Sequence, residues 1–240
     1  MKLDILAIAA HPDDVELSAA GTVIRSVEQG KKVGILDLTR GELGTRGTPE
    51  TRELEAKRAS EIMGIAVRDV VGLPDGFLNN VREQQFKLIP FIRKYQPDIV
   101  LANALMDRHP DHGMGAALTG KSCFLSGLRA IETSDEQGNP QQPWRPRAIY
   151  HFIQDRYMKP DFVVDISGYW SKKEEAIKAF SSQFFVGKED KEPSTPISTP
   201  EFMKFLEARS REFGRQINAE FGEGFVADRT VGITDLNYLV

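Results

Sequence analysis

The sequence predicts an α/β fold with a Rossmann-like, doubly wound, mostly parallel sheet and helices on both faces. Short apolar runs alternate with longer segments in which apolar residues recur at helical spacing, and glycine-rich turns separate them. Continuous apolar runs are typical of strands buried on both faces of a parallel sheet. Right-handed crossovers then place the helices on the two faces. The 240 residues are expected to form a single domain.

The first part of the chain, residues 1–128, is expected to form the core of this fold. The apolar run 5–10 predicts a strand, and the helical spacing over 15–29 ends at Gly30, a natural helix stop. The glycine-rich stretch 39–47 is expected to be a loop. The other expected elements are strands over 33–38, 68–71 and 98–102, a turn over 72–76, and helices over about 49–63, 81–95 and 112–125.

Residues 129–240 are expected to form a C-terminal elaboration of this core. It includes a polar, proline-containing stretch over 134–147. The segment 188–200 carries charge, three prolines and little apolar content, which predicts a mobile surface loop or lid. The expected elements are strands over 148–153 and 162–166, a helix over 170–180, a last helix from 200 to 213 or beyond, and a tail with little pattern.

Composition argues against several classes of protein. The net charge of -4 is spread over both signs without a basic stripe, so nucleic-acid binding is not expected. No apolar stretch approaches the roughly 20 residues needed to span a bilayer, and no signal peptide is recognised at Met1. The single cysteine, Cys123, excludes an internal disulfide and fits a reducing compartment. A cytoplasmic protein without a membrane partner is the expectation.

Two similar tetrads hold three of the four histidines in the chain. His-Pro-Asp-Asp at 11–14 follows the first predicted strand, and His-Pro-Asp-His at 109–112 comes a few residues after the fourth. The carboxyl ends of parallel strands meet at one edge, where open α/β sheets bind ligands. We therefore expect the two tetrads to form one site.

His11, Asp14 and His112 are the candidate metal ligands. Asp14 comes three residues after His11, so the first turn of a helix would bring both side chains to one side. Three nitrogen and oxygen ligands with an open fourth position are typical of a catalytic zinc ion, which lowers the pKa of its water to about 7. One Zn²⁺ per chain is the expected cofactor. Iron or another divalent ion also suits such a site.

Two further side chains of the tetrads are candidates for proton transfer. Asp13 would point about 100° away from its neighbouring ligand and could take a proton from water. His109 would face the same pocket and could protonate a leaving amine or stabilise an oxyanion. Either Asp111 or Asp107 could orient the second ring nitrogen of His109.

Simpler explanations exist for some of these residues. A single His-Pro-Asp tetrad would usually be a helix cap. Two matched tetrads at equivalent strand ends favour the metal site instead. His151 lies in an aromatic strand and is expected to be a packed or surface histidine without a catalytic role.

These residues resemble the LmbE-like, or PIG-L-type, zinc-dependent de-N-acetylases of N-acetylglucosamine conjugates. The first family motif, A-H-P-D-D followed closely by an acidic residue, stands at 10–16, and the second, H-P-D-H, at 109–112. Further similarity lies at 37–39, 51–53 and 223–225. The resemblance implies one domain of this family over 1–240 and assembly into a homo-oligomer, often a hexamer in relatives. It also implies that zinc binds His11, Asp14 and His112, with Asp13 as base and His109 as acid or electrostatic helper.

Within this family the chain looks most like the bacillithiol-biosynthesis deacetylases, which hydrolyse N-acetylglucosaminyl malate. The segments 38–48 and 73–76 carry that similarity. Malate brings two carboxylates, and arginine pairs with such groups in bidentate fashion. Arg52 and Arg108 match arginines that line the pocket in relatives, and Arg40 and Arg46 are further candidates. Alternatively, Arg46 and Arg52 are simply exposed on the surface.

One residue of some relatives has no counterpart in this sequence. A tyrosine near the C-terminus contributes to the oxyanion site in some relatives, but this chain has Phe213 and Phe221 in that region. Tyr157 or Tyr150 could substitute for it.

The expected function is zinc-dependent removal of the N-acetyl group from an N-acetylglucosamine conjugate, with release of acetate. N-acetylglucosaminyl malate is the expected substrate. One alternative is a related metal-dependent amidase acting on another N-acyl sugar or on a thiol conjugate. A second is a non-catalytic nucleotide-binding module, which residues 11–14 disfavour because they offer carboxylates where a phosphate needs glycines and free backbone amides.

Overall fold

The computed structural model describes residues 1–184 and 192–238. These residues form an α/β fold around a single mixed sheet. The strand order among these residues is β3-β2-β1-β4-β5-β7-β6. β1 to β5 run parallel, and β7 is antiparallel to both of its neighbours. This confirms the predicted class. The strands are β1 (Ile5–Ala9), β2 (Val33–Asp37), β3 (Val67–Val70), β4 (Ile99–Ala102), β5 (Ala148–Phe152), β6 (Phe162–Asp165) and β7 (Gly222–Ala227).

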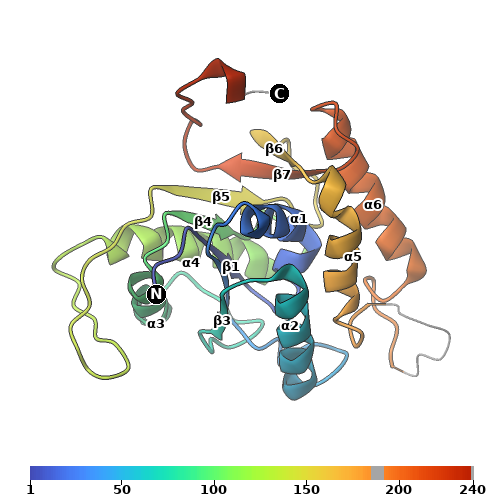
Figure 1. Cartoon of the computed structure of the whole chain (residues 1–240). Coiled ribbons are helices and arrows are strands. Elements are labelled where there is room, and N and C mark those ends of the chain that lie inside the picture. Colours follow the sequence, from blue (N-terminus) through green and yellow to red (C-terminus); the bar gives the residue numbers. More distant parts are fainter. Residues whose placement is uncertain (185–191, 239–240) are drawn as a thin grey trace.

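Helices cover both faces of the sheet (Figure 1). One face packs against α1 (Asp14–Glu28), α2 (Pro49–Met63) and α5 (Trp170–Lys178), and the other against α3 (Arg82–Tyr95) and α4 (Pro110–Ser126). The last helix, α6 (Pro200–Arg215), packs against β7. Short 3₁₀ turns lie at Ser167–Tyr169 and Leu236–Tyr238.

The central strand β1 shows why an apolar run predicts a doubly covered sheet. Side chains alternate between the faces of a strand. Ala7 and Ala9 belong to the core on the α1 side, whereas Leu6 and Ile8 belong to the core on the α4 side. All four are fully buried. The end of β1 is therefore held rigidly from both faces, and residues 11–14 follow directly.

The prediction of a tail with little pattern after the last helix was wrong, because this part of the chain contains β7. The glycines of this strand weaken its sequence pattern. A Cβ at Gly222 would lie 2.6 Å from a methyl group of Val163, and one at Gly224 would lie 3.1 Å from the Phe213 ring. A side chain at Gly222 thus has no room where β7 packs against β6, and one at Gly224 would displace Phe213 of α6. After β7 the chain projects from the body of the molecule (Figure 1).

The predicted loop over 188–200 is only partly described. Residues 188–191 lie outside the described residues, and α6 begins at Pro200. In between, the hydroxyl of Ser198 accepts a hydrogen bond from the Thr195 N–H at 2.8 Å. Ile197 lines the pocket described below.

A buried ion pair joins β7 to two helices. Lys173 of α5 donates to Glu223 of β7 at 2.7 Å, and both side chains are almost fully buried. Glu223 also accepts from the backbone N–H groups of Gly21 and Thr22 in α1, at 2.9 and 2.7 Å. Burial lowers the pKa of Lys173, and Glu223 opposes that shift.

Replacing Glu223 by leucine is expected to lower the free energy of unfolding by about 3–5 kcal/mol, because it leaves the Lys173 charge buried without its partner. Urea denaturation measures this loss. The double variant Lys173→Met/Glu223→Leu removes both charges and should lose less than the single variant. A single variant as stable as the wild type would contradict the assigned role of the pair.

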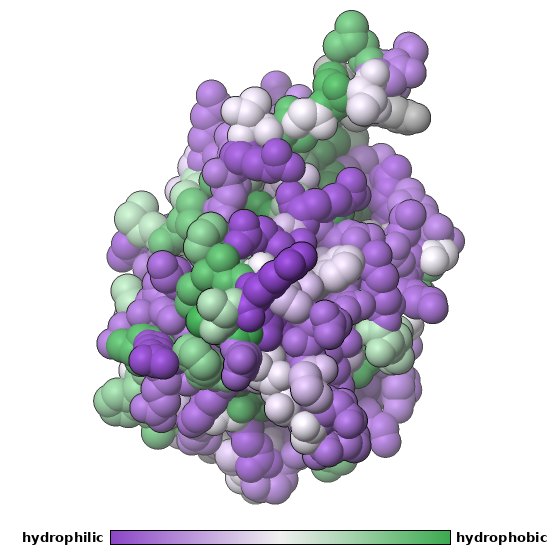
Figure 2. Space-filling model, turned by 90° about the vertical axis from the view of Figure 1, so that its left-hand side faces the viewer, coloured by the Kyte–Doolittle hydropathy of each residue, from purple (hydrophilic) through white to green (hydrophobic). Residues whose placement is uncertain are grey.

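The helices of the described residues do not have the features of membrane spans. Within the described ranges no helix has both the length and the apolar character required to cross a bilayer. Figure 2 shows one face of the molecule, on which hydrophilic residues predominate and apolar residues lie among them.

Candidate metal centre

The switch point of the sheet places the two tetrads together. β1 and β4 are adjacent and parallel, with Ile8 paired to Ala102. The chain builds β2 and β3 on one side of β1 before crossing to β4 on the other, so the segments after β1 and β4 flank a crevice. The rings of His11 and His109 lie 4.6 Å apart, and those of His109 and His112 lie 5.2 Å apart, between centroids. They line a pocket of about 360 Å³.

Asp14 lies between the rings of His11 and His112. Its Oδ2 is 3.6 Å from Nδ1 of His11, and its Oδ1 is 3.1 Å from Nε2 of His112. Ligand atoms that share a tetrahedral zinc ion at bonds of about 2.0–2.2 Å lie roughly 3.3–3.6 Å apart. The 3.6 Å distance has this spacing, the 3.1 Å distance is slightly shorter, and the two contacts use different oxygens of Asp14.

A carboxylate holds the second ring nitrogen of each candidate ligand histidine. Asp75 Oδ1 lies 3.0 Å from His11 Nε2, and Asp107 Oδ2 lies 2.5 Å from His112 Nδ1. Metal-binding histidines are usually oriented in this way. Burial would lower the pKa of His112, but Asp14 and Asp107 raise it to about 9. The acidic side chains thus favour positive charge at the place where a cation would be held.

Two side-chain amides that were not predicted from the sequence also donate hydrogen bonds to Asp14. Asn103 donates to its Oδ2 at 3.0 Å, and Gln154 donates to its Oδ1 at 3.0 Å. Asn103 and Gln154 are themselves linked at 2.9 Å. They follow β4 and β5, so the rule that sites lie at the carboxyl ends of strands could have found them. The same rule applies to Asp75 after β3.

Replacing Gln154 by leucine is expected to weaken metal binding about 10- to 100-fold, because the variant no longer orients Asp14. Competition with a chromogenic chelator measures the affinity. Gln183→Leu is the matched control, since Gln183 also lines the pocket but donates to the carbonyl of Arg46. Equal affinities of the two variants would contradict this role of Gln154.

His109 differs from its neighbours in its contacts. Its Nδ1 accepts a hydrogen bond from the backbone N–H of Asp111 at 3.2 Å. The expectation that Asp107 or Asp111 orients this ring was wrong, because the Asp107 carboxylate contacts His112 and that of Asp111 accepts from the Gly76 N–H. Burial lowers the pKa of His109, and the charges of His11 and His112 lower it further. A three-histidine cluster is also compact, with one ring nitrogen of each within 4.8 Å of the others.

Asp13 is buried at the pocket in a strained backbone conformation. Its φ of 132° lies in a region that residues with a Cβ rarely adopt, and such strain is common at functional sites. Its Oδ2 accepts from Nη2 of Arg52 at 3.0 Å. Burial raises the pKa of Asp13 to about 7, against the lowering effect of Arg52. A carboxyl group in this range can exchange a proton at neutral pH.

Two of the four candidate substrate arginines line the pocket. Arg52 is buried rather than exposed, and it donates to Asp13 and to the carbonyls of Pro12 and Gly41. Its contacts therefore support the Asp13 loop. Arg108 is half exposed and pairs with Asp155, which also lines the pocket, at 3.2 Å.

The other two arginines are not among the residues that line this pocket. Arg40 pairs with the exposed Glu53 of α2 at 3.3 Å. Arg46 is buried, and it donates to the carbonyl of Ser182 at 2.6 Å and to that of Pro193 at 3.0 Å. We expected both arginines to bind substrate. In the structure Arg40 instead pairs with α2, and Arg46 donates to backbone carbonyls at residues 182 and 193.

Neither candidate tyrosine lines the pocket. Tyr157 is exposed and stacks on Phe213, with ring centroids 6.1 Å apart, and Tyr150 packs edge-on against Phe162. His151 is buried with its ring nitrogens near the Asn103 carbonyl and the Asp228 carboxylate, at 2.8 and 2.9 Å. It is a packed histidine, one of the two expected forms.

The chain is similar to known proteins over most of its length. The family described as PIG-L, GlcNAc-PI de-N-acetylase, matches residues 6–122. Diacetylchitobiose deacetylase of Thermococcus kodakarensis is 30% identical over 190 residues, which are 75% of this chain and 70% of that protein. A probable N-acetyl-alpha-D-glucosaminyl L-malate deacetylase 2 of Bacillus anthracis is 26% identical, covering 75% and 81%. The crystal structure of a conserved protein from Thermus thermophilus superposes with a TM-score of 0.85 at 36% identity, covering 98% of each chain.

Proposed function

This chain belongs to the PIG-L family of GlcNAc-PI de-N-acetylases, and on that basis we propose that it hydrolyses the N-acetyl amide of an N-acetylglucosamine conjugate. The products are acetate and the free amino sugar. Family membership supports an amide-cleaving hydrolase, and the proposal extends it to a zinc-dependent enzyme whose substrate is N-acetylglucosaminyl malate.

The observation that carries the proposal is the position of Asp14 between two histidines that are each backed by a carboxylate. His11, Asp14 and His112 would hold one zinc ion. Zinc bound there would supply Lewis-acid chemistry, which polarises the acetyl carbonyl and lowers the pKa of water.

The chain's own residues then move the protons. Asp13 takes a proton from the attacking water, and Arg52 holds the Asp13 carboxylate in place at 3.0 Å. His109 accepts a backbone N–H at Nδ1 and its pKa is lowered, so it is neutral and donates a hydrogen bond from Nε2 to the developing oxyanion. Asp13 then gives the proton that it took from water to the departing amine. One water is consumed, the amide C–N bond breaks, and the amine leaves with the proton it needs.

Malate as the aglycone, the part of the conjugate joined to the sugar, is supported by the similarity to the Bacillus anthracis protein and by Arg108 at the pocket. The test is acetate release by the zinc-loaded protein from N-acetylglucosaminyl malate, diacetylchitobiose and N-acetylglucosamine. We expect the malate conjugate to have the highest kcat/KM. A preference for diacetylchitobiose would overturn the malate assignment, and release from none of the three would overturn the deacetylase assignment for these sugars.

A further inference from the structure

Arg209 of α6 is a cation in the pocket that the sequence did not single out. It lines the same cavity as Asp13 and His109. Its guanidinium makes no hydrogen bond or ion pair with any residue in the described ranges, and its Nη1 is buried without a partner. Arg52 and Arg108, the other arginines of the pocket, are both already bonded to carboxylates.

The carboxylates near Arg209 have other partners. Asp155 pairs with Arg108, and Asp107 holds His112 and accepts from the Arg156 N–H at 2.8 Å. They affect Arg209 only by electrostatic attraction, without a hydrogen bond. Burial lowers the pKa of Arg209 to about 10, so the group is still a cation at neutral pH. The N–H donors of this cation therefore have no partner among the described residues that would compete with a ligand.

Apolar side chains line the pocket together with this guanidinium, and we refer to them as the apolar wall. The central carbon of the guanidinium lies 5.1 Å from the centre of the Phe205 ring, which restrains its orientation. Ile197, Phe202 and Leu206 also line the pocket. Away from bulk water, charge-assisted hydrogen bonds are stronger and an unpaired cation is costly. The wall therefore favours a ligand that brings a negative charge.

We propose that Arg209 binds an anionic group, a carboxylate or a phosphate, on the aglycone of the substrate and so selects anionic amino-sugar conjugates over neutral ones. The inference deepens the proposed deacetylase function and rests on it. It assigns specificity to α6, which lies about a hundred residues beyond the second tetrad, rather than to the arginines of the glycine-rich loop.

Three substrates that share the N-acetylglucosamine unit test this proposal. The malate conjugate carries carboxylates, N-acetylglucosamine 1-phosphate carries a phosphate, and the methyl glycoside is neutral. Arg209→Gln is expected to lower kcat/KM for at least one anionic substrate about 10- to 100-fold, since hydrogen bonds to charged groups are of this strength. For the neutral glycoside the change should stay below about threefold. The substrate that responds identifies the anion as carboxylate or phosphate.

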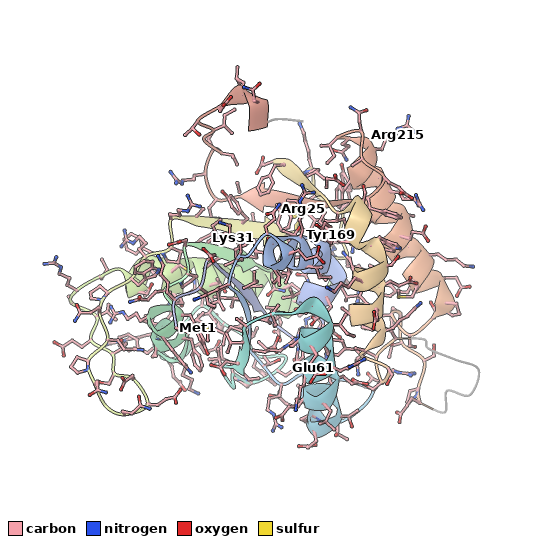
Figure 3. All side chains as sticks on the ribbon, in the orientation of Figure 1. Met1, Arg25, Lys31, Glu61, Tyr169 and Arg215 are labelled. Carbon is pink, nitrogen blue, oxygen red and sulfur yellow. The ribbon has the colours of Figure 1, made fainter. Side chains whose placement is uncertain are left out.

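Arg215→Gln is the matched control. Arg215 is an exposed arginine at the C-terminal end of the same helix, where it points away from the body of the molecule (Figure 3). This variant removes one charge from α6 without touching the pocket, so all three substrates should react as with the wild type. If Arg209→Gln lowers kcat/KM equally for the neutral and the anionic substrates, its role is structural and the proposal is overturned.

A binding measurement separates this inference from the deacetylase assignment. Calorimetric titration of the metal-free protein with L-malate and with inorganic phosphate needs no turnover. We expect wild type and Arg215→Gln to bind one of these anions at least 10-fold more tightly than Arg209→Gln does. Equal binding by all three proteins, or binding by none, would overturn the role of Arg209 even if the enzyme deacetylates sugars. Lack of turnover with retained, Arg209-dependent binding would instead overturn the deacetylase assignment.

Discussion

Replacing Asp13 by asparagine is expected to lower kcat about 10²- to 10⁴-fold, the usual contribution of a positioned general base. Asparagine cannot take a proton from water, but its side-chain oxygen can still accept the hydrogen bond from Arg52. It is also a better probe than alanine, because asparagine tolerates positive φ more readily than most residues and Asp13 has a φ of 132°. Steady-state acetate release, together with metal analysis of the same sample, measures the effect.

Asp98→Asn is the control for this substitution. Asp98 directly precedes β4, at the opposite end of that strand from the pocket, and pairs with the exposed Lys2 at 3.1 Å, a type of contact that contributes little. The control should retain wild-type kcat. Activity in a metal-replete Asp13→Asn protein would exclude Asp13 as the base, and loss of the metal would make it a ligand.

Replacing His112 by glutamine is expected to reduce bound metal from about one ion per chain to near zero after dialysis, and to abolish turnover with it. The variant removes one of three protein ligands, and the usual catalytic zinc site has three. His109→Gln should keep its metal and still lose about 10²-fold in kcat, because His109 is assigned to the oxyanion rather than to the metal ion. Elemental analysis by mass spectrometry and acetate release measure the two quantities.

This pair of variants separates the two possible ligand sets. His11, His109 and His112 also form a compact cluster, so a three-histidine site is the direct competitor of the proposed one. Loss of metal from both variants would support the competitor. Loss from His112→Gln alone agrees with Asp14 as the third ligand.

The fold could be predicted from the sequence where local chemistry determines it. The helix predicted over 49–63 has those bounds in the structure because Thr48 caps it, Pro49 begins it and Gly64 ends it with a φ of 71°. The strands before the two tetrads were predicted because burial on both faces leaves continuous apolar runs. Their pairing at the switch point then brought the tetrads together.

The remaining site residues depend on tertiary placement. Asp75 and Gln154 follow other strands, and neither stands in a motif that reveals its partner. Arg209 lies on α6, which packs against β7. The glycines of β7 weaken its strand pattern, so this strand was not predicted from the sequence. Arg46 looked like a substrate ligand in the sequence, yet the loop folds so that its guanidinium meets backbone carbonyls. Long-range contacts of this kind have no local sequence signal.

The most direct test of the proposed metal centre is a crystal structure of the zinc-loaded protein with anomalous data collected on both sides of the zinc absorption edge. We predict one zinc peak per chain, bonded to His11, Asp14 and His112, with His109 and Asp13 unbonded to it. His11, Asp75 and Asp111 also place one ligand atom each within 4.8 Å of the others. A peak bonded to His109 in place of Asp14, a peak between these three residues, or no zinc peak in the pocket would contradict this prediction.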